Sequence, residues 1–302
     1  MNILLLYNPM SGRTNFKKHI RQIIRFFQKT NHLLDVYESK KPGDLKEYSA
    51  QMAASYDVFL VAGGDGTVNE VVNGMMKTDH RPVLGILPAG TANDTAAILG
   101  INKHIHRSLK LFLSEEPVWM DVNTVNDQYF LYTVSSGMLT KISYAVSRRH
   151  IKKYGYLAYV IEAMKDISVD YNYPISITYD HDRLDLDCVM ILGLSTNRVG
   201  GMRLYNFSHA KLNDGKLELR VFRRAKSLWR FRVFSSFIRG GKKLREDLHL
   251  SASYYKIQTR DDVNWNADGE YSTSGSVEIK THKEAIRVFA STKSKKHFFT
   301  SS

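Results

Sequence analysis

The pattern of apolar positions changes near residue 120 and divides the chain into two regions. In the first region, short apolar runs typical of buried strands alternate with segments whose apolar residues recur every three or four positions, as on a helix face. The pattern predicts strands at Ile3–Tyr7, His32–Ser39, Val58–Ala62 and Val83–Leu87, and helices at Phe16–Thr30, Asp44–Ser55, Val68–Met76 and Asn93–Leu99. Such alternation predicts a parallel sheet with crossover helices, in which ligands bind at the carboxyl ends of the strands.

After about Val118 the pattern becomes predominantly strand-like, with turn signals such as Asn213-Asp214-Gly215 between the strands. The predicted strands are Tyr129–Val134, Ile175–Tyr179, Leu184–Leu192, Lys216–Phe222, Tyr254–Gln258, Val277–Lys280 and Ala285–Ala290. Two helical stretches, at about Tyr156–Ile167 and Ser227–Arg239, interrupt them. We expect an α/β domain formed by residues 1–122 together with 285–302, and a β-rich sandwich or barrel formed by residues 123–284.

A glycine-rich turn, Gly63-Gly64-Asp65-Gly66-Thr67, follows the predicted strand Val58–Ala62. Glycine permits positive φ angles and close backbone approach, and the N–H groups at the start of a helix attract anions. Asp65 would repel a phosphate directly, so its presence indicates an intervening Mg²⁺ ion or water. The turn is neither a P-loop, because no Gly-Lys-Ser/Thr follows, nor a dinucleotide fingerprint, because Asn69 occupies the third glycine position. The alternative is an ordinary tight turn.

Two more loops with the same character follow the first and fourth predicted strands. They are Asn8–Gly12 and Pro88–Asp94, and each offers backbone donors, hydroxyl groups and a helix start. Ser11 or Thr91 alone would be interpreted as a helix cap. Three such loops after three strands of one sheet predict a shared phosphate site.

Together with Ala210–Gly215 and Asn266–Glu270, these loops resemble the bacterial diacylglycerol kinase-type family of soluble lipid kinases, which includes phosphatidylglycerol-kinase-like proteins. The glycine-rich turn alone also occurs in NAD kinases and sphingosine kinases, whereas the two motifs in the β-rich region make the resemblance specific. The resemblance covers nearly the whole chain. It implies a Rossmann-like α/β domain with a C-terminal β-sandwich, and ATP-dependent transfer of the γ-phosphate to a lipid hydroxyl, with diacylglycerol as the expected acceptor and phosphatidic acid as the product.

The resemblance also implies a role for each matching residue. The residues expected to contact ATP are Asn8, Ser11, Gly12, Ser39, Gly63, Gly64, Asp65, Gly66, Thr67 and Thr91. Asp268 and Glu270 occupy the catalytic Asp-Gly-Glu element, and either of them could be the general base.

Two magnesium sites are implied in the same way. Asp65, Asp94 and Asp121 match acidic residues that organise the catalytic Mg²⁺, partly through water. A second, structural Mg²⁺ would bind the carboxylate of Asp214 and the backbone carbonyls of Lys211 and Lys216.

Three positions depart from the family pattern. Ala92 stands where glycine is common, Ala97 where arginine is frequent, and Thr95 where an aromatic residue is usual. These departures bear on the acceptor and on turnover more than on ATP binding. They also motivate one alternative, a non-catalytic regulator that binds nucleotide or lipid. The other alternative is an NAD kinase-like enzyme.

Composition and charge indicate the expected partners and cellular compartment of the protein. The formal net charge of +13 favours anionic partners such as a membrane surface. The lone Cys188 excludes an internal disulfide and fits a reducing compartment. No segment approaches the ~20 apolar residues of a spanning helix, and the N-terminal run Ile3–Tyr7 lacks the features of a signal peptide. We therefore expect a cytoplasmic protein that associates peripherally with membranes.

Two basic segments are candidates for membrane contact. Ser227–Arg239 interleaves arginines with large apolar residues, and Arg148–Lys153 is a second basic cluster. A basic amphipathic helix fits an anionic membrane surface, although a helix packed on its own domain would show the same pattern. Nucleic acid is not an expected partner, because no known binding module is present. The resemblance implies that a homodimer can form.

Overall fold

The structure is a computed structural model that describes residues 1–11, 16–138, 171–199, 202–204, 207, 209–223, 232–233, 235–236, 239–245 and 247–300. The chain divides into two compact units. Unit 1 consists of Met1–Val122, Lys211–Asp214 and Lys283–Ser302, and unit 2 of Asn123–Ala210 and Gly215–His282. Compared with the expected division, unit 1 also takes the loop Lys211–Asp214 from the middle of the β-rich region.

Unit 1 contains a parallel sheet with the strand order β2-β1-β3-β4-β17. Its strands are β1 (Asn2–Tyr7), β2 (Leu33–Glu38), β3 (Val58–Gly63), β4 (Val83–Pro88) and the end of β17 (Val277–Val288). Every residue of β3 is buried, as its continuous apolar sequence predicts for a strand covered on both faces. The parallel sheet expected from the sequence is confirmed.

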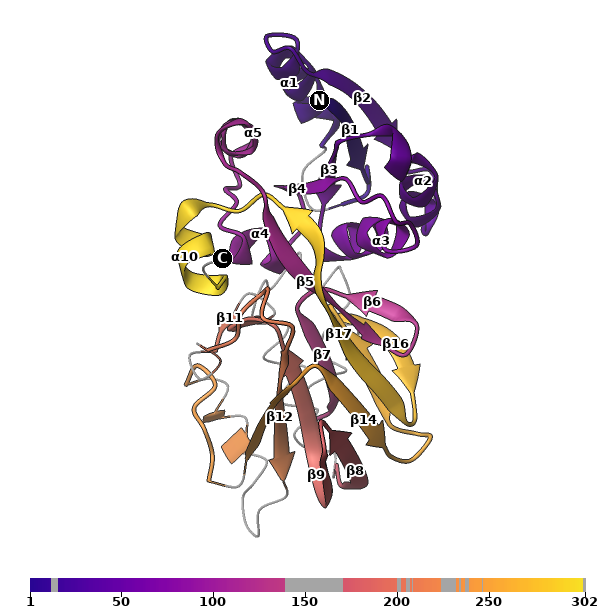
Figure 1. Cartoon of the computed structure of the whole chain (residues 1–302), viewed down its shortest axis with the longest axis vertical. Coiled ribbons are helices and arrows are strands. Elements are labelled where there is room, and N and C mark those ends of the chain that lie inside the picture. The colour runs from indigo at the N-terminus through magenta and orange to yellow at the C-terminus, as the bar shows by residue number, and fades with distance from the viewer. Residues whose placement is uncertain are drawn as a thin grey trace. The chain divides into compact units, whose positions relative to one another are not determined.

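The helices of unit 1 lie on both sides of this sheet (Figure 1). They are α1 (Lys17–Phe27), α2 (Asp44–Met52) with the short 3-10 turn Ala53–Ser55, α3 (Asp65–Met75), α4 (Asp94–Ile98), α5 (Ile105–Ser114) and α10 (Thr292–Phe298). Helix α1 contacts α5, and α2 contacts α3. The sequence analysis missed α5, although Ile105, Leu109 and Phe112 are buried at helical spacing.

Unit 2 is built from antiparallel strand pairs. Its strands are β6 (Gln128–Phe130), β7 (Thr133–Gly137), β8 (Tyr173–Tyr179), β9 (Asp182–Leu194), β12 (Leu217–Arg223), β13 (Leu248–Ala252), β14 (Tyr254–Gln258), β15 (Asn264–Ala267), β16 (Glu270–Ser274) and the short pair β10 (Arg198–Val199) and β11 (Met202–Arg203). Strands β5 (Val118–Val125) and β17 contribute residues to both units. The first part of β9 pairs with β8 and its last part with β7.

Two apolar clusters pack on the strands of unit 2. The larger one joins residues of β7, β8, β9, β12, β14 and β17, among them Ile177, Ile191 and Val221. The smaller one contains Met190 and Leu192, the chain neighbours of Ile191. Because successive side chains of a strand point to opposite faces, the two clusters lie on the two faces of β9.

Three sequence predictions fall largely outside this description. The predicted helix Tyr156–Ile167 and the basic cluster Arg148–Lys153 lie outside the described residues, and only Arg232, Val233, Ser235, Ser236 and Arg239 of the second predicted helix are described. No helix in the described parts of the chain has the length and apolar composition needed to cross a bilayer.

Candidate active site

The loops that follow β1, β3 and β4 lie side by side at the carboxyl edge of the unit 1 sheet. The backbone N–H of Asn8 donates to the carbonyl of Ala62 at 3.2 Å, and that of Ala89 donates to the carbonyl of Gly63 at 2.9 Å. These bonds continue the strand ladder past the strand ends. The sequence prediction that the three loops share one edge is therefore confirmed.

Hydroxyl groups from separate loops also come together at this edge. Ser11 Oγ and Thr67 Oγ1 lie 3.1 Å apart. The N–H of Ser39 donates to the carbonyl of Tyr7 at 2.9 Å, which holds the residue after β2 beside the end of β1. Gly12, the remaining predicted ATP contact of the first loop, lies outside the described residues.

Close packing requires a glycine both in the glycine-rich turn and in the loop after β4. A Cβ atom added to Gly63 would lie 2.3 Å from Thr67 Cβ, and one added to Gly90 would lie 2.4 Å from Gly64 Cα. None of the turn glycines is among the described residues with positive φ, and Gly64 is extended, with φ −90° and ψ −176°. Close backbone approach, one of the two properties that glycine permits, is therefore the one that these residues use.

Helix α3 begins inside the glycine-rich turn rather than after it. The N–H of Val68 donates to the carbonyl of Gly64 at 3.1 Å, so the helix starts at Asp65, three positions before the predicted start. The N–H groups of a first helical turn have no partners within the helix. Those of Asp65, Gly66 and Thr67 therefore form an anion-binding helix start at the sheet edge.

Asp65 links this helix start to the loop after β4. Its Oδ1 atom accepts hydrogen bonds from the N–H of Thr95 at 2.9 Å and from the Thr95 hydroxyl at 3.0 Å. Its Oδ2 atom accepts from the N–H of Asp94 at 3.1 Å. Asp65 therefore caps α4, and this role accounts for the carboxylate in the glycine-rich turn without a metal. Its part in Mg²⁺ binding stays a prediction.

The loop that carries Thr91 is closed by Asn93. The Asn93 side chain accepts from the N–H of Gly90 and donates to the Gly90 carbonyl, each at 2.7 Å. Asn93 itself has a positive φ of 53°, a conformation that asparagine tolerates better than most residues. The loop thus places Thr91 between a fixed glycine and the start of α4.

Two of the predicted magnesium residues are buried carboxylates. Asp94 is 0% exposed at the start of α4, and Asp121 is 3% exposed in β5. Asp121 Oδ1 accepts from the N–H of Glu284 at 2.7 Å, and its own N–H donates to the carbonyl of Leu212 at 2.7 Å. The second bond attaches the loop Lys211–Asp214 to unit 1.

Helix α10 holds the same loop from its other side. The N–H of Leu212 donates to the carbonyl of Phe298, and Lys211 Nζ donates to the carbonyl of His297, both at 2.7 Å. The loop leaves unit 1 at Gly215, whose φ is 80°, so that Lys216 belongs to unit 2. The magnesium site proposed from Lys211, Asp214 and Lys216 stays a prediction.

Unit 1 offers the carboxylate ligands that Mg²⁺ prefers, but its described residues do not form a complete protein cage for the ion. Carboxylate oxygens are its preferred protein ligands, and Mg²⁺ usually keeps several waters while binding one or two carboxylates and substrate phosphates. Within the described ranges, no group of three or more His, Cys, Asp or Glu side chains gathers as a cage. The assignment of Asp65, Asp94 and Asp121 to a catalytic Mg²⁺ therefore stays a prediction.

The Asp-Gly-Glu element forms the hairpin between β15 and β16 in unit 2. Asp268 and Gly269 both have positive φ, 49° and 92°, as a tight two-residue hairpin of the I′ type requires. The N–H of Gly269 donates to Asn266 Oδ1 at 3.0 Å. The Asp-Gly-Glu element is therefore a tight hairpin turn that carries two carboxylates, Asp268 and Glu270.

The two carboxylates differ sharply in their surroundings. Asp268 is 6% exposed and accepts hydrogen bonds from the N–H groups of Leu131, Tyr132 and Thr133 at 2.7, 3.0 and 3.2 Å. These bonds interrupt the predicted strand Tyr129–Val134 and separate β6 from β7. Glu270, by contrast, is exposed at the start of β16. The structure therefore gives Asp268 an anchoring role and leaves the Glu270 side chain on the surface.

A polar group that the sequence analysis missed lies beside the first loop. The hydroxyl of Tyr7, the last residue of β1, donates to Glu38, and Glu38 Oε1 accepts from Lys17 Nζ at 2.8 Å. Burial and the neighbouring Glu38 carboxylate raise the pKa of Tyr7 to about 12. The Tyr7 hydroxyl thus links the end of β1 to Glu38 at the end of β2.

Comparison with known protein families gives two matches that together cover most of the chain. Residues 2–125 match the diacylglycerol kinase catalytic domain. Residues 132–290 match the YegS C-terminal NAD kinase beta sandwich-like domain. The expected pairing of an N-terminal α/β domain with a C-terminal β-sandwich is therefore confirmed.

Individual relatives agree with these matches. A diacylglycerol kinase of Bacillus subtilis is 32% identical over 272 residues, which are 88% of this chain and 89% of the relative. A diacylglycerol kinase of Staphylococcus saprophyticus is 28% identical over 288 residues, 94% of each chain. The solved structure of a diacylglycerol kinase from Bacillus anthracis aligns with a TM-score of 0.75 at 24% identity and covers 97% of both chains. That last likeness supports the fold alone.

Proposed function

Because this chain belongs to the bacterial diacylglycerol kinase family and is thus a lipid kinase, we propose that it transfers the γ-phosphate of ATP to the free hydroxyl of diacylglycerol. The products are phosphatidic acid and ADP. The observation that carries the proposal is the capping of α4 by Asp65, which binds the glycine-rich turn to the loop of Thr91. This arrangement brings helix starts and hydroxyl groups to one edge of the sheet, as a nucleotide phosphate chain requires.

Phosphoryl transfer needs positioning, charge neutralisation and an acceptor for the hydroxyl proton. The N–H groups at the start of α3 and the hydroxyls of Ser11 and Thr67 would bind and orient the ATP phosphates. Mg²⁺, held with its waters by Asp94 and Asp121, would neutralise charge on the phosphates. The family supports ATP as the donor, and Mg²⁺ is part of the proposal.

We assign the proton acceptor to Glu270 rather than Asp268. A general base must approach the lipid hydroxyl to within about 3 Å or reach it through one water. Asp268 already accepts three backbone hydrogen bonds, whereas Glu270 is exposed. In this scheme the lipid oxygen forms a bond to the γ-phosphorus, the bond to the ADP oxygen breaks, and the lipid proton passes to Glu270.

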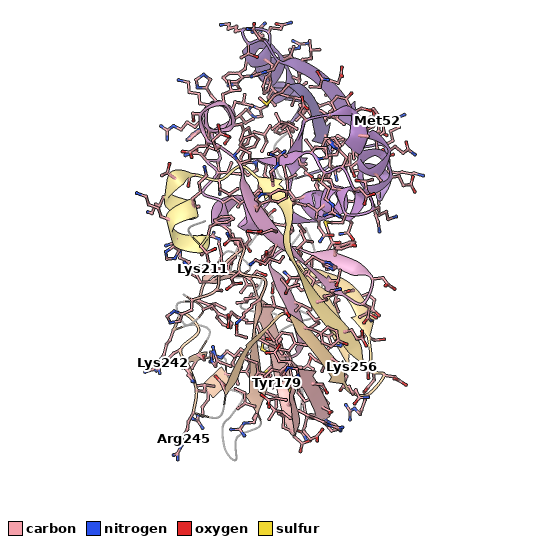
Figure 2. All side chains as sticks on the ribbon, viewed as in Figure 1. Met52, Tyr179, Lys211, Lys242, Arg245 and Lys256 are labelled. Atoms are coloured by element: carbon pink, nitrogen blue, oxygen red, sulfur yellow. The ribbon has the colours of Figure 1, made fainter. Side chains whose placement is uncertain are left out.

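The lipid acceptor implies work at a membrane surface. Arg239, Lys242, Lys243 and Arg245 are exposed basic residues of one segment of unit 2, with Lys242 and Arg245 visible at its edge in Figure 2. Basic residues near an anionic bilayer contribute about 1 kcal/mol each to binding. We therefore propose a cytoplasmic enzyme that meets anionic membranes peripherally through this segment.

The decisive experiment offers the purified protein several acceptors with radiolabelled ATP and Mg²⁺. Mixed micelles would carry diacylglycerol, monoacylglycerol, phosphatidylglycerol or sphingosine, and NAD⁺ would be supplied in solution. The proposal predicts labelled phosphatidic acid as the dominant product. Label in another lipid would correct the acceptor, label in NADP⁺ would favour the NAD kinase-like alternative, and ATP binding without any labelled product would favour the non-catalytic regulator.

A further inference from the structure

The hydroxyl of Thr133 is one of several buried polar groups of unit 2 that lack a hydrogen-bond partner among the described residues. Thr133, the first residue of β7, is 4% exposed, and its Oγ1 atom has no hydrogen-bond partner among the described residues. A buried polar group without a partner lowers stability. Such a group therefore needs either a functional reason or a ligand that pairs with it.

The position of Thr133 ties it to the Asp-Gly-Glu element. Its N–H donates to Asp268 Oδ1 at 3.2 Å, and its carbonyl accepts from the N–H of Asp268 at 2.9 Å. The unpaired hydroxyl thus belongs to the residue that holds the hairpin of Glu270 through two backbone hydrogen bonds.

On the face of β7 that carries Thr133, the neighbouring residues are polar towards β15 and apolar towards β9. Thr133 and Ser135 share this face, since they are two residues apart in a strand. Towards β15, Ser135 lies opposite Asn266. Towards β9, Thr133 and Ser135 lie opposite Leu194 and Leu192.

The two leucines belong to the smaller apolar cluster of unit 2, which contains Met138, Met190, Leu192, Leu194, Leu204, Phe207, Phe222 and Val233. Directly opposed residues of an antiparallel pair place their side chains on the same face within about 5 Å. Hydroxyl groups therefore border a buried apolar cluster on this face. A glycerolipid also places polar groups next to apolar ones, because its ester carbonyls join a polar glycerol to apolar acyl chains.

The opposite face of β7 supplies a contrast. Ser136 is equally buried, but its hydroxyl donates to the carbonyl of Asn264 at 2.9 Å. A hydroxyl in β7 can therefore be satisfied within unit 2, whereas that of Thr133 has no partner among the described residues.

We propose that Thr133 positions the acceptor lipid by donating a hydrogen bond from its hydroxyl to an ester carbonyl of diacylglycerol, with Ser135 beside it. The acyl chains would follow the apolar cluster that begins at Leu194 and Leu192. This inference rests on the proposed lipid kinase function and refines it, because it makes the ester linkage a recognised feature of the substrate.

The test compares ester-linked diacylglycerol with a dialkylglycerol of equal chain length, which keeps the free hydroxyl but lacks the carbonyls. For the wild-type enzyme, we expect a KM about tenfold higher with the ether lipid, as the loss of one hydrogen bond would give. Thr133→Val keeps the side-chain shape and should raise the KM for the ester lipid by the same factor, leave kcat within about twofold and change the ether KM little. Thr133→Ser should restore the wild-type preference.

Ser136→Ala is the matched control, because it removes a hydroxyl that is paired inside the fold; it should lower stability without changing the ratio of ester to ether KM. Equal wild-type KM values for the two lipids would overturn the inference even if Thr133→Val failed to fold. So would an equal loss on both lipids in Thr133→Val. Absence of wild-type transfer to every lipid would instead refute the proposed function itself.

Discussion

Asp65 and Thr95 are joined by two hydrogen bonds to one oxygen, from the backbone N–H of Thr95 at 2.9 Å and from its hydroxyl at 3.0 Å. The first residue of α3 thereby caps α4, two helices that start from neighbouring strands. A helix cap satisfies N–H groups that would otherwise lack a partner. The pair therefore sets the distance between the glycine-rich turn and the loop of Thr91, and with it the shape of the proposed nucleotide site.

Removing the charge of Asp65 should loosen this connection. Asp65→Asn replaces one of the two accepting oxygens with an amide NH₂, which donates and does not accept, and we expect a loss of about 1–2 kcal/mol in the free energy of unfolding. ATP affinity should fall as well, since the two loops lose their spacing. Urea unfolding and calorimetric ATP titration measure the two effects. Thr95→Val, which removes only the hydroxyl bond, should give a smaller loss; unchanged ATP affinity in Asp65→Asn would show that the cap does not shape the site.

The hydroxyls of Ser11 and Thr67, 3.1 Å apart, should act on ATP as a pair. We expect Ser11→Ala and Thr67→Val each to weaken ATP binding by about three- to tenfold, because each removes a hydrogen-bonding group at the phosphate site. The double variant should lose less than the sum of the two free energies, as contacting residues are not independent. Calorimetric titration of the four proteins completes the cycle. Ser114→Ala, at the exposed end of α5, is the control and should leave ATP affinity unchanged. Strictly additive losses of binding free energy in the double variant would argue against joint action by Ser11 and Thr67.

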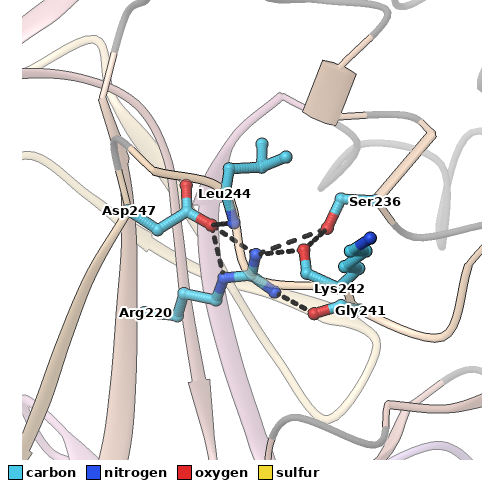
Figure 3. A network of polar contacts seen from close by, with 6 residues as sticks. All are labelled: Arg220, Ser236, Gly241, Lys242, Leu244 and Asp247. Carbon is cyan, nitrogen blue, oxygen red and sulfur yellow. Dashed lines mark hydrogen bonds and ion pairs between the residues drawn. The ribbon is translucent and has the colours of Figure 1, made fainter.

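A buried ion pair fixes the segment that carries the exposed basic residues of unit 2. Arg220 is fully buried in β12 and bonds to Asp247, with Nε to Oδ2 at 2.9 Å (Figure 3). Its other nitrogens donate to the carbonyls of Gly241 at 2.7 Å and Lys242 at 2.9 Å. The guanidinium also lies 4.3 Å from the centre of the Phe222 ring.

Breaking this pair should destabilise the protein strongly. Arg220→Met leaves the Asp247 carboxylate buried and without its cation, and we expect a loss of about 3–5 kcal/mol in the free energy of unfolding. The double variant Arg220→Met/Asp247→Leu removes the stranded charge and should recover much of that loss. The exposed pair Arg183–Asp185 gives the control, since Arg183→Met should change stability by less than about 1 kcal/mol. A similar small change for Arg220→Met would contradict the account.

The contact between α5 and α10 should make stability depend on pH. Lys295 Nζ lies 2.8 Å from Glu115 Oε2, and the Thr292 hydroxyl donates to Glu115 Oε1 at 2.6 Å. These two hydrogen bonds lower the pKa of Glu115 below its ordinary value of 4.5. A lowered pKa in the folded state means that the unfolded state binds the proton more tightly. The contribution is therefore complete above pH 4.5 and is lost as the pH falls through the folded-state pKa.

The measurement is the urea midpoint between pH 7 and pH 3 for the wild type and Glu115→Gln. We expect Glu115→Gln to be less stable than the wild type by about 1 kcal/mol at pH 7, as for a partly exposed ion pair. The difference should shrink towards zero at pH 3. A difference that stays constant with pH would show that the Glu115 charge does not hold α10.

The sequence predicted the parallel sheet and its loops well because β1, β3 and β4 are largely apolar runs, each followed by a loop that contains glycine together with serine or threonine. It missed α5, although Ile105, Leu109 and Phe112 are spaced as on a helix face. It also could not separate β6 from β7, because the break at Leu131 and Tyr132 is imposed by the distant carboxylate of Asp268.

The candidate site shows the same limit. Local spacing identified the glycine-rich turn, but the bond from Asp65 to α4 joins residues about thirty positions apart and has no signature in either segment. The sequence likewise left open which of Asp268 and Glu270 is the base. Only the three N–H groups that surround Asp268 distinguish an anchoring carboxylate from an exposed one.

The central claim is that Glu270 accepts the proton while the loops of unit 1 bind ATP. The most direct measurement is the rate of γ-phosphate transfer to diacylglycerol, taken together with ATP affinity, for the wild type, Glu270→Gln and the exposed control Glu278→Gln of β17. We predict that Glu270→Gln loses about 10²–10⁴-fold in transfer rate with ATP affinity within about twofold of the wild type, and that Glu278→Gln keeps both. Full transfer activity in Glu270→Gln would contradict the account.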